Sequence, residues 1–391
     1  MNIYTLAKTH HAWAVSLRRH FHMHPEITGS EYQTQAKLLA VLQELHIDCR
    51  PAAKTGVLAE IKCAHPGKTI AIRADIDALP IQDACGKPYQ SQNAGVCHAC
   101  GHDGHIAVGL GTLRIIHELR NQLSGTFRFL FQPNEEQFPS GALAMVKDGA
   151  LENVQAIIGA HIWQPIQLGT IGVTYGNIMA APDKFKITIQ GKGGHGSMPH
   201  QTVDPTLIAA QMILALNTIV SRSIDPLKLA VVSVGAMHAG TVFNIIPETA
   251  TIEGTVRSFD KEMRQQIFDR IQTIADGICQ ANAATAQVET LFGHPAIVNV
   301  PEYSKAIATA TGNCHTPIKA VEVPPVMCGE DFSHYLNVVP GAFFFIGTGT
   351  EEIIYPHHHP KFDLDERSIL YGMEVMTRTA IDLAKKTALC Q

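Results

Sequence analysis

Four short stretches of this sequence concentrate side chains that bind metal ions. Thiol, imidazole and carboxylate groups crowd residues 97–105, and two acids follow at Glu135 and Glu136. His161 and the histidine triplet 357–359 complete the set. Mixed nitrogen, oxygen and sulfur ligands hold a divalent ion while leaving open positions for water and substrate. Each stretch alone is typical of a polar loop or a surface histidine, but together they predict a hydrolytic metal site.

Motifs typical of other chemistry also occur, but each lacks its usual context. Cys97 and Cys100 have the spacing of a zinc-ribbon half or a redox pair, yet no second such pair follows. Gly191, Gly193 and Gly196 match the dinucleotide-binding GxGxxG, but no helix opens behind them and no acid ends a following strand. HExxH and GxSxG are absent, which disfavours single-helix zincins and nucleophile-elbow serine hydrolases.

The metal-binding stretches come at the ends of apolar segments. Apolar spacing predicts a helix over 12–47 and another in the latter part of 98–120. Strands are predicted over 54–63, 68–80, 125–133 and 154–163, with the last one stopping at His161. Strands that alternate with helices and end in polar residues predict an α/β fold, in which a mostly parallel sheet carries the site at its carboxyl edge.

The pattern changes near Asp183, where alternating strands and two amphipathic helices begin. Their order, β-α-β-β-α with a final strand near 284–293, is that of a ferredoxin-like α+β unit. A chain of 391 residues exceeds the usual size of one core. We therefore predict a catalytic metal-binding domain made of 1–182 and 291–391, with a smaller domain inserted at 183–290.

Composition excludes several functional classes. A net charge of -5 leaves no basic surplus for nucleic acid, and no apolar run is long enough to span a membrane. The first residues lack the basic start, apolar stretch and cleavage site of a secretory signal, so we expect a cytoplasmic protein. The nine cysteines are scattered, and no disulfide framework follows.

Ten ordered motifs along the whole chain resemble those of the M20 metallopeptidase family, in the branch of aminoacylases, hippurate hydrolases and indole-acetyl-amino-acid hydrolases. They are RRHFHMHPE at 18–26, RADIDALP at 73–80, HACGHDGH at 98–105, QPNEE at 132–136, GAHIW at 159–163, GKGGHGSMPH at 191–200, NIIP at 244–247, GTVRSFD at 254–260, GEDF at 329–332 and HHHPKFDLDE at 357–366. The resemblance implies a zinc-exopeptidase-like catalytic domain with an inserted lid and dimerisation domain.

Carried over by motif position, the resemblance implies two divalent metal ions and a glutamate general base, Glu135. The implied metal ligands are Cys100, His102, Glu136, His161 and His358. His358 is chosen within the triplet because the family ligand stands two residues before the proline, here Pro360. A thiolate ligand favours Zn, Ni or Co, while the family also uses Mn.

The resemblance also implies residues that support or complete the site. Asp75 and Asp77 would orient the ligating groups, with a solvent-capped strand end as the alternative. In relatives the inserted domain pairs edge to edge, which implies a homodimer, or a tetramer built from it. His195 and Asn244 would then reach the partner's site as donors to the carbonyl oxyanion. Arg257 would bind a substrate carboxylate, or else form a surface salt bridge.

The activity implied is hydrolysis of the amide bond of small N-acyl amino acids, of N-acetyl or N-benzoyl type, to a carboxylate and a free amino acid. One alternative is a dipeptidase or carboxypeptidase of the same fold, and another is a non-catalytic metal-binding or interaction protein. The CGHDGH form favours the acyl-amino-acid branch, and every implied ligand is present. One departure is QPNEEQFPSGA at 132–142, where relatives usually have a glycine-rich stretch, and it leaves the shape of the local pocket open. The sequence does not specify the preferred acyl group, the preferred amino-acid side chain or the native metal.

Overall fold

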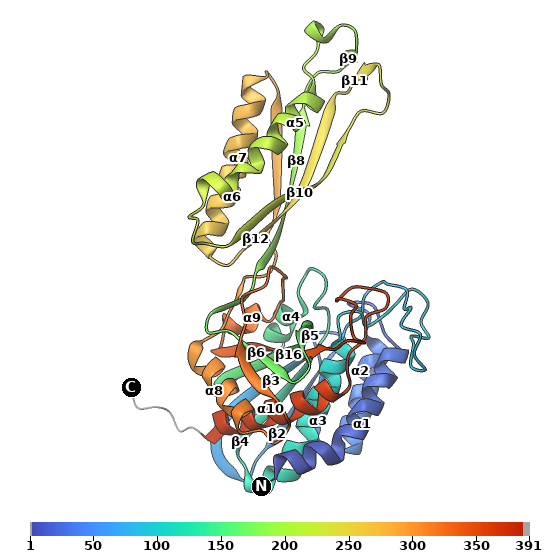
Figure 1. The fold of residues 1–391 in the computed structure, drawn as a ribbon, viewed down its shortest axis with the longest axis vertical. Coiled ribbons are helices and arrows are strands. Elements are labelled where there is room, and N and C mark those ends of the chain that lie inside the picture. Colours follow the sequence, from blue (N-terminus) through green and yellow to red (C-terminus); the bar gives the residue numbers. More distant parts are fainter. Residues whose placement is uncertain (1, 386–391) are drawn as a thin grey trace. The chain divides into compact units, whose positions relative to one another are not determined.

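The computed structural model describes residues 2–385, which form two compact units (Figure 1). The first contains the described residues up to Ile178, then Val298–Pro325, and those from Asp331 onward. The second contains Met179–Ile297 and Val326–Glu330. Most of the second unit is therefore one long insertion, Met179–Ile297, in the chain of the first unit. Cys390 lies outside the described residues, and the eight cysteines within them are free thiols.

Two helices open the first unit where one was predicted. Helix α1 (Ile3–Met23) is capped by the Asn2 side chain, which accepts a hydrogen bond from the Thr5 backbone N–H, and α2 (Tyr32–Glu44) follows it. The prediction of one continuous helix over 12–47 was wrong because residues 24–31 break it. Pro25 has no N–H to donate, and Gly29 adopts a left-handed φ of 80°.

An eight-stranded sheet forms the centre of this unit. In spatial order its strands are β1 (Asp48–Ala52), β2 (Gly56–Lys62), β4 (Ser124–Gln132), β3 (His65–Asp75), β5 (Ala156–Gln167), β16 (Gly341–Gly349), β6 (Thr170–Val173) and β15 (Lys319–Glu322). Four of the seven pairings are parallel, which confirms the mostly parallel sheet. Buried apolar residues of these strands and of the covering helices form its largest core.

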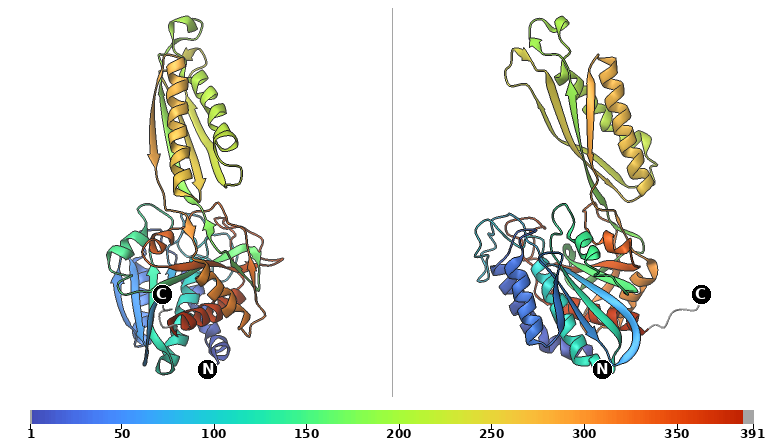
Figure 2. Two further views of the ribbon diagram at one scale, coloured as in Figure 1. Left: turned by 90° about the vertical axis from the view of Figure 1, so that its left-hand side faces the viewer. Right: turned by 180° about the vertical axis from the view of Figure 1, so that it is seen from behind.

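Helices cover the sheet, as the two views of Figure 2 show. Helix α3 (His102–Leu119) packs on β3, and α10 (Arg367–Lys385) packs on β3, β4 and β16. Helix α8 (Pro301–Gly312) lies beside α10, while α1 contacts both α3 and α10. The shorter elements are η1 (Arg120–Gln122), α4 (Gly141–Lys147), α9 (Ser333–Leu336), β7 (Asn177–Met179) and β14 (Ile297–Val298).

The parallel strands at the centre of the sheet end at one edge. Asp75 at the end of β3 pairs with Gln132 at the end of β4. Strand β5 was predicted to stop at His161 but runs on to Gln167, because β16 continues to pair with it. Its pairing with β3 ends at Arg73 and Gly159, so His161 lies just beyond the last pair on that side. His161 and the loops after β3 and β4 therefore meet at the carboxyl edge.

The second unit is a four-stranded antiparallel sheet with the ferredoxin-like strand order. The order is β10 (Ala230–Ala239), β12 (Thr249–Ser258), β8 (Ala181–Gln190) and β13 (Thr285–Leu291). Helices α5 (Pro205–Leu216) and α7 (Lys261–Ala281) pack on it, with the short α6 (Thr218–Ser223) beside them. Strand β8 alternates buried and exposed residues because one face meets the helices. A separate ribbon joins β9 (Gly194–His195) to β11 (Ile245–Ile246), and η2 (Pro199–Gln201) follows β9.

No helix within residues 2–385 is long and apolar enough to cross a membrane.

Candidate metal centre

The predicted ligands come together from four segments at the carboxyl edge of the large sheet. Cys100 directly precedes α3, and His102 is the first residue of that helix. Gly101 between them has a left-handed φ of 88°, a conformation that glycine adopts without strain. Glu136 follows β4 and His161 lies in β5. The fold thus gathers donors that are far apart in the sequence.

The donor atoms lie close enough to share metal ions. Cys100 Sγ is 3.4 Å from Nε2 of His161, and Nε2 of His358 is 3.3 Å from Oε1 of Glu136. Donor atoms lie within 4.8 Å of one another in each of three groups, which are Cys100, His102 and His161; Cys100, Glu136 and His358; and His102, Glu135 and Glu136. Cys100, His102 and Glu136 each belong to two groups, as expected of ligands around a pair of adjacent ions.

The histidines are held in the tautomer that metal binding requires. His102 Nδ1 lies 2.9 Å from the Asp77 carbonyl oxygen, and His161 Nδ1 lies 2.7 Å from the Ile162 carbonyl oxygen. Since a carbonyl only accepts, both Nδ1 atoms carry a hydrogen, and each Nε2 is the ring atom left for a metal ion, which at His102 would take the place of a proton. Nε2 of His102 and Oε1 of Glu136 are buried without a hydrogen-bond partner. These donors fit a bound cation.

Electrostatics at the site also favour added positive charge. Burial lowers the pKa of His102, but Asp75 and Asp77 outweigh it and raise it to about 10. Burial, together with Glu136 and Glu135, holds the pKa of the Cys100 thiol well above its usual range. Metal binding would replace the thiol proton, because the thiolate is the ligand. Carboxylates therefore exceed cations here, and divalent ions would balance them.

Asp77 and Asp75 lie directly behind the predicted ligands. Oδ2 of Asp77 accepts the backbone N–H groups of Glu135 at 3.0 Å and Glu136 at 3.1 Å, and Oδ1 lies 3.2 Å from His102 Nδ1. Burial raises the pKa of Asp77, but its hydrogen bond with His102 outweighs burial and keeps that pKa lowered. Asp75 Oδ2 accepts from Arg73 Nη1 at 2.6 Å. Both acids are fully buried, so neither is a solvent-capped strand end.

Two further residues, His105 and Asp331, support the site, although no role in it was predicted for them from the sequence. His105 Nδ1 lies 2.5 Å from Asp75 Oδ1, and its Nε2 accepts the backbone N–H of Ile162 at 2.8 Å. Asp331 accepts from Arg73 Nη2 at 3.0 Å and from the Ser140 hydroxyl at 2.7 Å. The three-residue spacing of His102 and His105 on one helix face, and the acid within GEDF, were the available signals.

The histidine triplet separates into three different environments. Nε2 of His357 donates to the Ile162 carbonyl at 3.0 Å, and its ring stacks on Trp163 with centroids 4.6 Å apart. His359 stacks on Tyr355. His358 has a left-handed φ of 65° and donates its backbone N–H to the Ala99 carbonyl at 2.8 Å. This turn leaves His358 as the member of the triplet that faces Glu136.

The other predicted residues lie in the second unit. His195 of β9 pairs with Ile245 of β11, and the Asn244 carbonyl accepts the backbone N–H of Gly196 at 2.9 Å. The ribbon therefore brings His195 and Asn244 together. Arg257 lies in β12, half-buried, where its Nε donates to the Met327 carbonyl at 3.0 Å. Among residues 2–385 it forms no ion pair, so the salt-bridge alternative is wrong for this structure.

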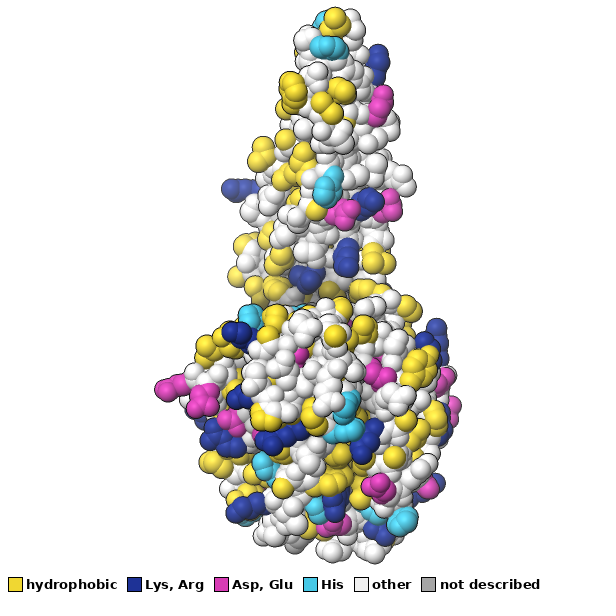
Figure 3. Space-filling view, turned by 90° about the vertical axis from the view of Figure 1, so that its right-hand side faces the viewer, with side chains coloured by type: hydrophobic (Ala, Val, Ile, Leu, Met, Phe, Trp, Pro, Cys, Tyr) yellow, Lys and Arg dark blue, Asp and Glu magenta, His cyan; other side chains and the backbone are white. Residues whose placement is uncertain are grey.

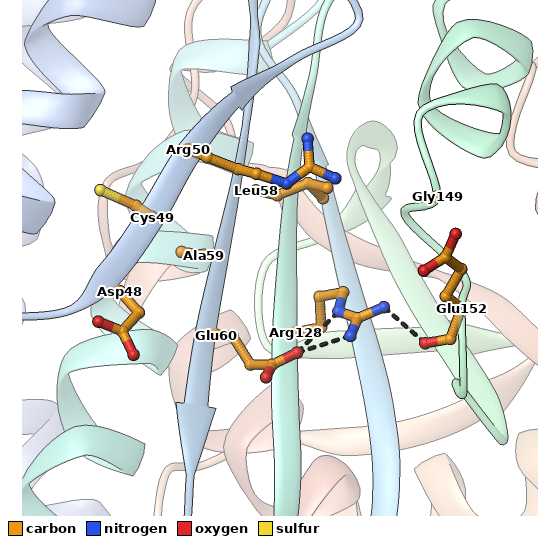
Figure 4. A pocket seen from close by; sticks show the side chains of 9 residues that line it. All are labelled: Asp48, Cys49, Arg50, Leu58, Ala59, Glu60, Arg128, Gly149 and Glu152. Carbon is orange, nitrogen blue, oxygen red and sulfur yellow. Dashed lines mark hydrogen bonds and ion pairs between the residues drawn. The ribbon is translucent and has the colours of Figure 1, made fainter.

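A hollow elsewhere in the first unit contains none of these residues. It measures about 360 Å³ and lies over β1, β2 and β4, as Figure 4 shows. Arg128 crosses its floor, with Nη2 2.6 Å from Glu60 Oε2 and Nη1 2.7 Å from the Glu152 carbonyl. Its charge is paired, so the hollow lacks the converging free donors of the metal centre.

Comparisons with known proteins agree with this geometry. A sequence model described as peptidase family M20/M25/M40 matches residues 71–382. An N-acetylcysteine deacetylase of Bacillus subtilis is 41% identical over 96% of this chain and 97% of its own, and an N-acyl-L-amino acid amidohydrolase of Geobacillus stearothermophilus is 45% identical over 74% of this chain and 78% of its own. The crystal structure of Bacillus subtilis YxeP, described as a dinuclear metal-binding peptidase of the M20 family, superposes with a TM-score of 0.86 at 36% identity, over 97% of this chain and 99% of that one.

Proposed function

The chain belongs to peptidase family M20/M25/M40, and on this premise we propose that it cleaves the amide bond of N-acyl amino acids to a carboxylate and a free amino acid. It is a metal-dependent hydrolase that acts on amides. The observation that carries the proposal is the set of three overlapping donor groups, in which a buried thiol, imidazoles and carboxylates lie within 4.8 Å of one another. Relatives with deacetylase and amidohydrolase names support N-acetyl substrates.

Cys100, His102, Glu136, His161 and His358 would hold the two ions. Bound ions supply Lewis acidity, which brings the pKa of a coordinated water towards neutrality and polarises the amide carbonyl. Glu135 would take the proton from the attacking water and deliver it to the leaving nitrogen. The Asp77 carboxylate fixes the backbone of both glutamates, which keeps the base and the ligand in place.

His195 and Asn244 would stabilise the oxyanion that forms at the carbonyl oxygen when water adds to the carbonyl carbon, as donors from a second subunit. Support comes from the surface of the second unit. Apolar side chains recur along the side of it that Figure 3 shows. The exposed apolar side chains of α5, β10, β11 and the residues beside them include Leu214, Leu229, Met237, Phe243 and Ile245. Strand β10 is also an edge strand with an unpaired side. Exposed apolar side chains beside an open strand edge are typical of a subunit interface.

A substrate panel tests the proposal. Protein dialysed against a strong chelator should be inactive, and added Zn, Mn, Co or Ni should restore hydrolysis of N-acetyl or N-benzoyl amino acids. Dipeptides assayed in parallel test the alternative that the chain is a dipeptidase or carboxypeptidase. Turnover by protein that elemental analysis shows to be metal-free would contradict the metal dependence. Hydrolysis of dipeptides, without hydrolysis of N-acyl amino acids, would show that the chain is a dipeptidase or carboxypeptidase. We further propose a cytoplasmic location, where the Cys100 thiol stays reduced.

A further inference from the structure

A second buried cluster of metal-type donors lies near the proposed centre and has no part in its chemistry. It contains His22 at the end of α1, Asp83 in the 76–101 connection, and Cys97 in the same connection. Their donor atoms lie within 4.8 Å of one another, and all three side chains are buried. Nitrogen, oxygen and sulfur donors from two distant segments therefore converge in the core.

The His22 imidazole is oriented as a metal-ligating histidine is. Its Nδ1 lies 2.8 Å from Oδ2 of Asp103, and since a carboxylate accepts, Nδ1 carries the hydrogen. Nε2 then points to Asp83, whose Oδ2 is 3.3 Å away, and it has no hydrogen-bond partner. A carboxylate behind a histidine whose other nitrogen is free is the usual arrangement of a zinc-bound histidine.

A fourth donor stands beside the cluster. Asp83 Oδ1 accepts the backbone N–H of Cys85 at 2.8 Å. Cys85 therefore lies close to Asp83, and its thiol contributes to the raised pKa of the Cys97 thiol, after burial, Asp83 and Asp103. One nitrogen, one oxygen and two sulfur donors form a set that suits tetrahedral zinc.

Three buried carboxylates, those of Asp83, Asp103 and Asp363, surround one fixed cation, Arg18, at this cluster. Arg18 pairs with Asp103 at 2.6 Å and with Asp363 at 2.7 Å, so Asp83 is left without a fixed cation beside it. A proton on His22 is one solution: burial and Arg18 lower the pKa of His22, but Asp103 and Asp83 raise it to about 10. That solution gives the two thiols no role. A metal ion uses all four donors.

The position of the cluster gives such an ion a structural task. Residues 76–101 connect β3 to α3 without a helix or a long strand, and such connections in compact domains are uncommon unless something holds them. A cross-link between Asp83, Cys97 and α1 would close this connection just before Cys100. We propose that His22, Asp83, Cys85 and Cys97 bind a structural zinc ion, separate from the two-metal centre, that fastens the 76–101 connection to α1.

Cobalt substitution tests the site without relying on activity. In Cys100→Ser protein the thiolate of the hydrolytic centre is gone, so a thiolate-to-cobalt charge-transfer band would come from the second cluster. We expect the band in Cys100→Ser, absent when Cys85→Ser and Cys97→Ser are both added to it, and retained in the control Cys63→Ser/Cys100→Ser, whose half-buried thiol lies outside the cluster. No band in Cys100→Ser, or a band that survives loss of both Cys85 and Cys97, would overturn the proposal.

Metal counting provides a second test if Cys100→Ser fails to fold. Mass spectrometry should find about one zinc ion per chain fewer in Cys97→Ser than in the wild type, because one four-ligand site binds one ion. Cys97→Ser should still hydrolyse the wild-type substrates, because Cys97 belongs to no donor group of the hydrolytic centre. An unchanged zinc count in folded Cys97→Ser would show that a protonated His22 between two aspartates is the true arrangement.

Discussion

Oδ1 of Asp77 lies 3.2 Å from Nδ1 of His102, while Oδ2 of the same carboxylate accepts the backbone N–H groups of Glu135 and Glu136. One buried side chain thus fixes a histidine from α3 and both glutamates that follow β4. The positions of these three predicted site residues therefore depend on one another through this carboxylate.

Asp77→Asn should therefore weaken metal binding about 10- to 100-fold, the usual scale for losing the carboxylate behind a ligating histidine. The amide keeps the shape but loses the charge and one acceptor. Competition with a fluorescent chelator measures the affinity. Thr28→Val is the matched control, because it removes another donor to the same Oδ2 at 2.8 Å while keeping the charge. Equal losses in both variants would mean that Asp77 acts through packing alone.

The two adjacent glutamates should respond differently to the same substitution. Glu135→Gln should keep its metal and substrate affinity while kcat falls roughly 100-fold or more, the scale of lost general-base catalysis. Glu136→Gln should lose metal, because it removes a charged ligand that lies 3.3 Å from His358. Metal content and kcat together decide the assignment. Metal loss in Glu135→Gln with retention in Glu136→Gln would reverse the two roles.

His195 should act on the site of the partner subunit. His195→Ala and Glu135→Ala proteins should each be inactive, and mixing them should restore roughly a quarter of wild-type activity, because half of the dimers are mixed and each has one intact site of two. Subunit exchange is checked with differently tagged chains. Confirmed exchange without recovered activity would place His195 in its own subunit's site or outside catalysis.

Glu374 should make the first unit sensitive to acid. Burial raises the pKa of this α10 carboxylate, but hydrogen bonds from the His315 backbone and from Arg378 outweigh burial and lower it below its ordinary value of 4.5. Its stabilising effect is therefore complete above that value and is lost as the pH falls through the lowered pKa.

Glu374→Gln should thus cost about 1–3 kcal/mol at neutral pH, the scale for disrupting a buried charged hydrogen-bonding group, and the difference from wild type should shrink in acid. Urea unfolding at several pH values measures it. Glu302→Gln, in the first turn of α8, is a control on a neighbouring exposed acid. A difference that grows as the pH falls would contradict the lowered pKa.

Local pattern predicted much of this fold because apolar spacing along a strand or helix reports which face is buried. The alternation of β8 and the apolar runs of β4 and β16 are visible in the sequence and are reproduced in the structure. The helix break at 24–31 was also encoded locally, by Pro25 and Gly29, but the helical spacing on both sides concealed it. The continuation of β5 past His161 was not local, since it depends on pairing with β16, far along the chain.

The sequence by itself determined which metal-binding types of side chain are present, and the order of the motifs that contain them supplied the resemblance to a family. Only the tertiary structure decided how those ligands are supported, because the supporting contacts join residues far apart in the chain. His358 faces Glu136 because its backbone turns left-handed and bonds Ala99. Asp77 reaches the glutamates only because β3 and β4 end side by side. The sequence specifies the type of each side chain directly, whereas the partners of that side chain depend on which strands and loops come together when the core forms.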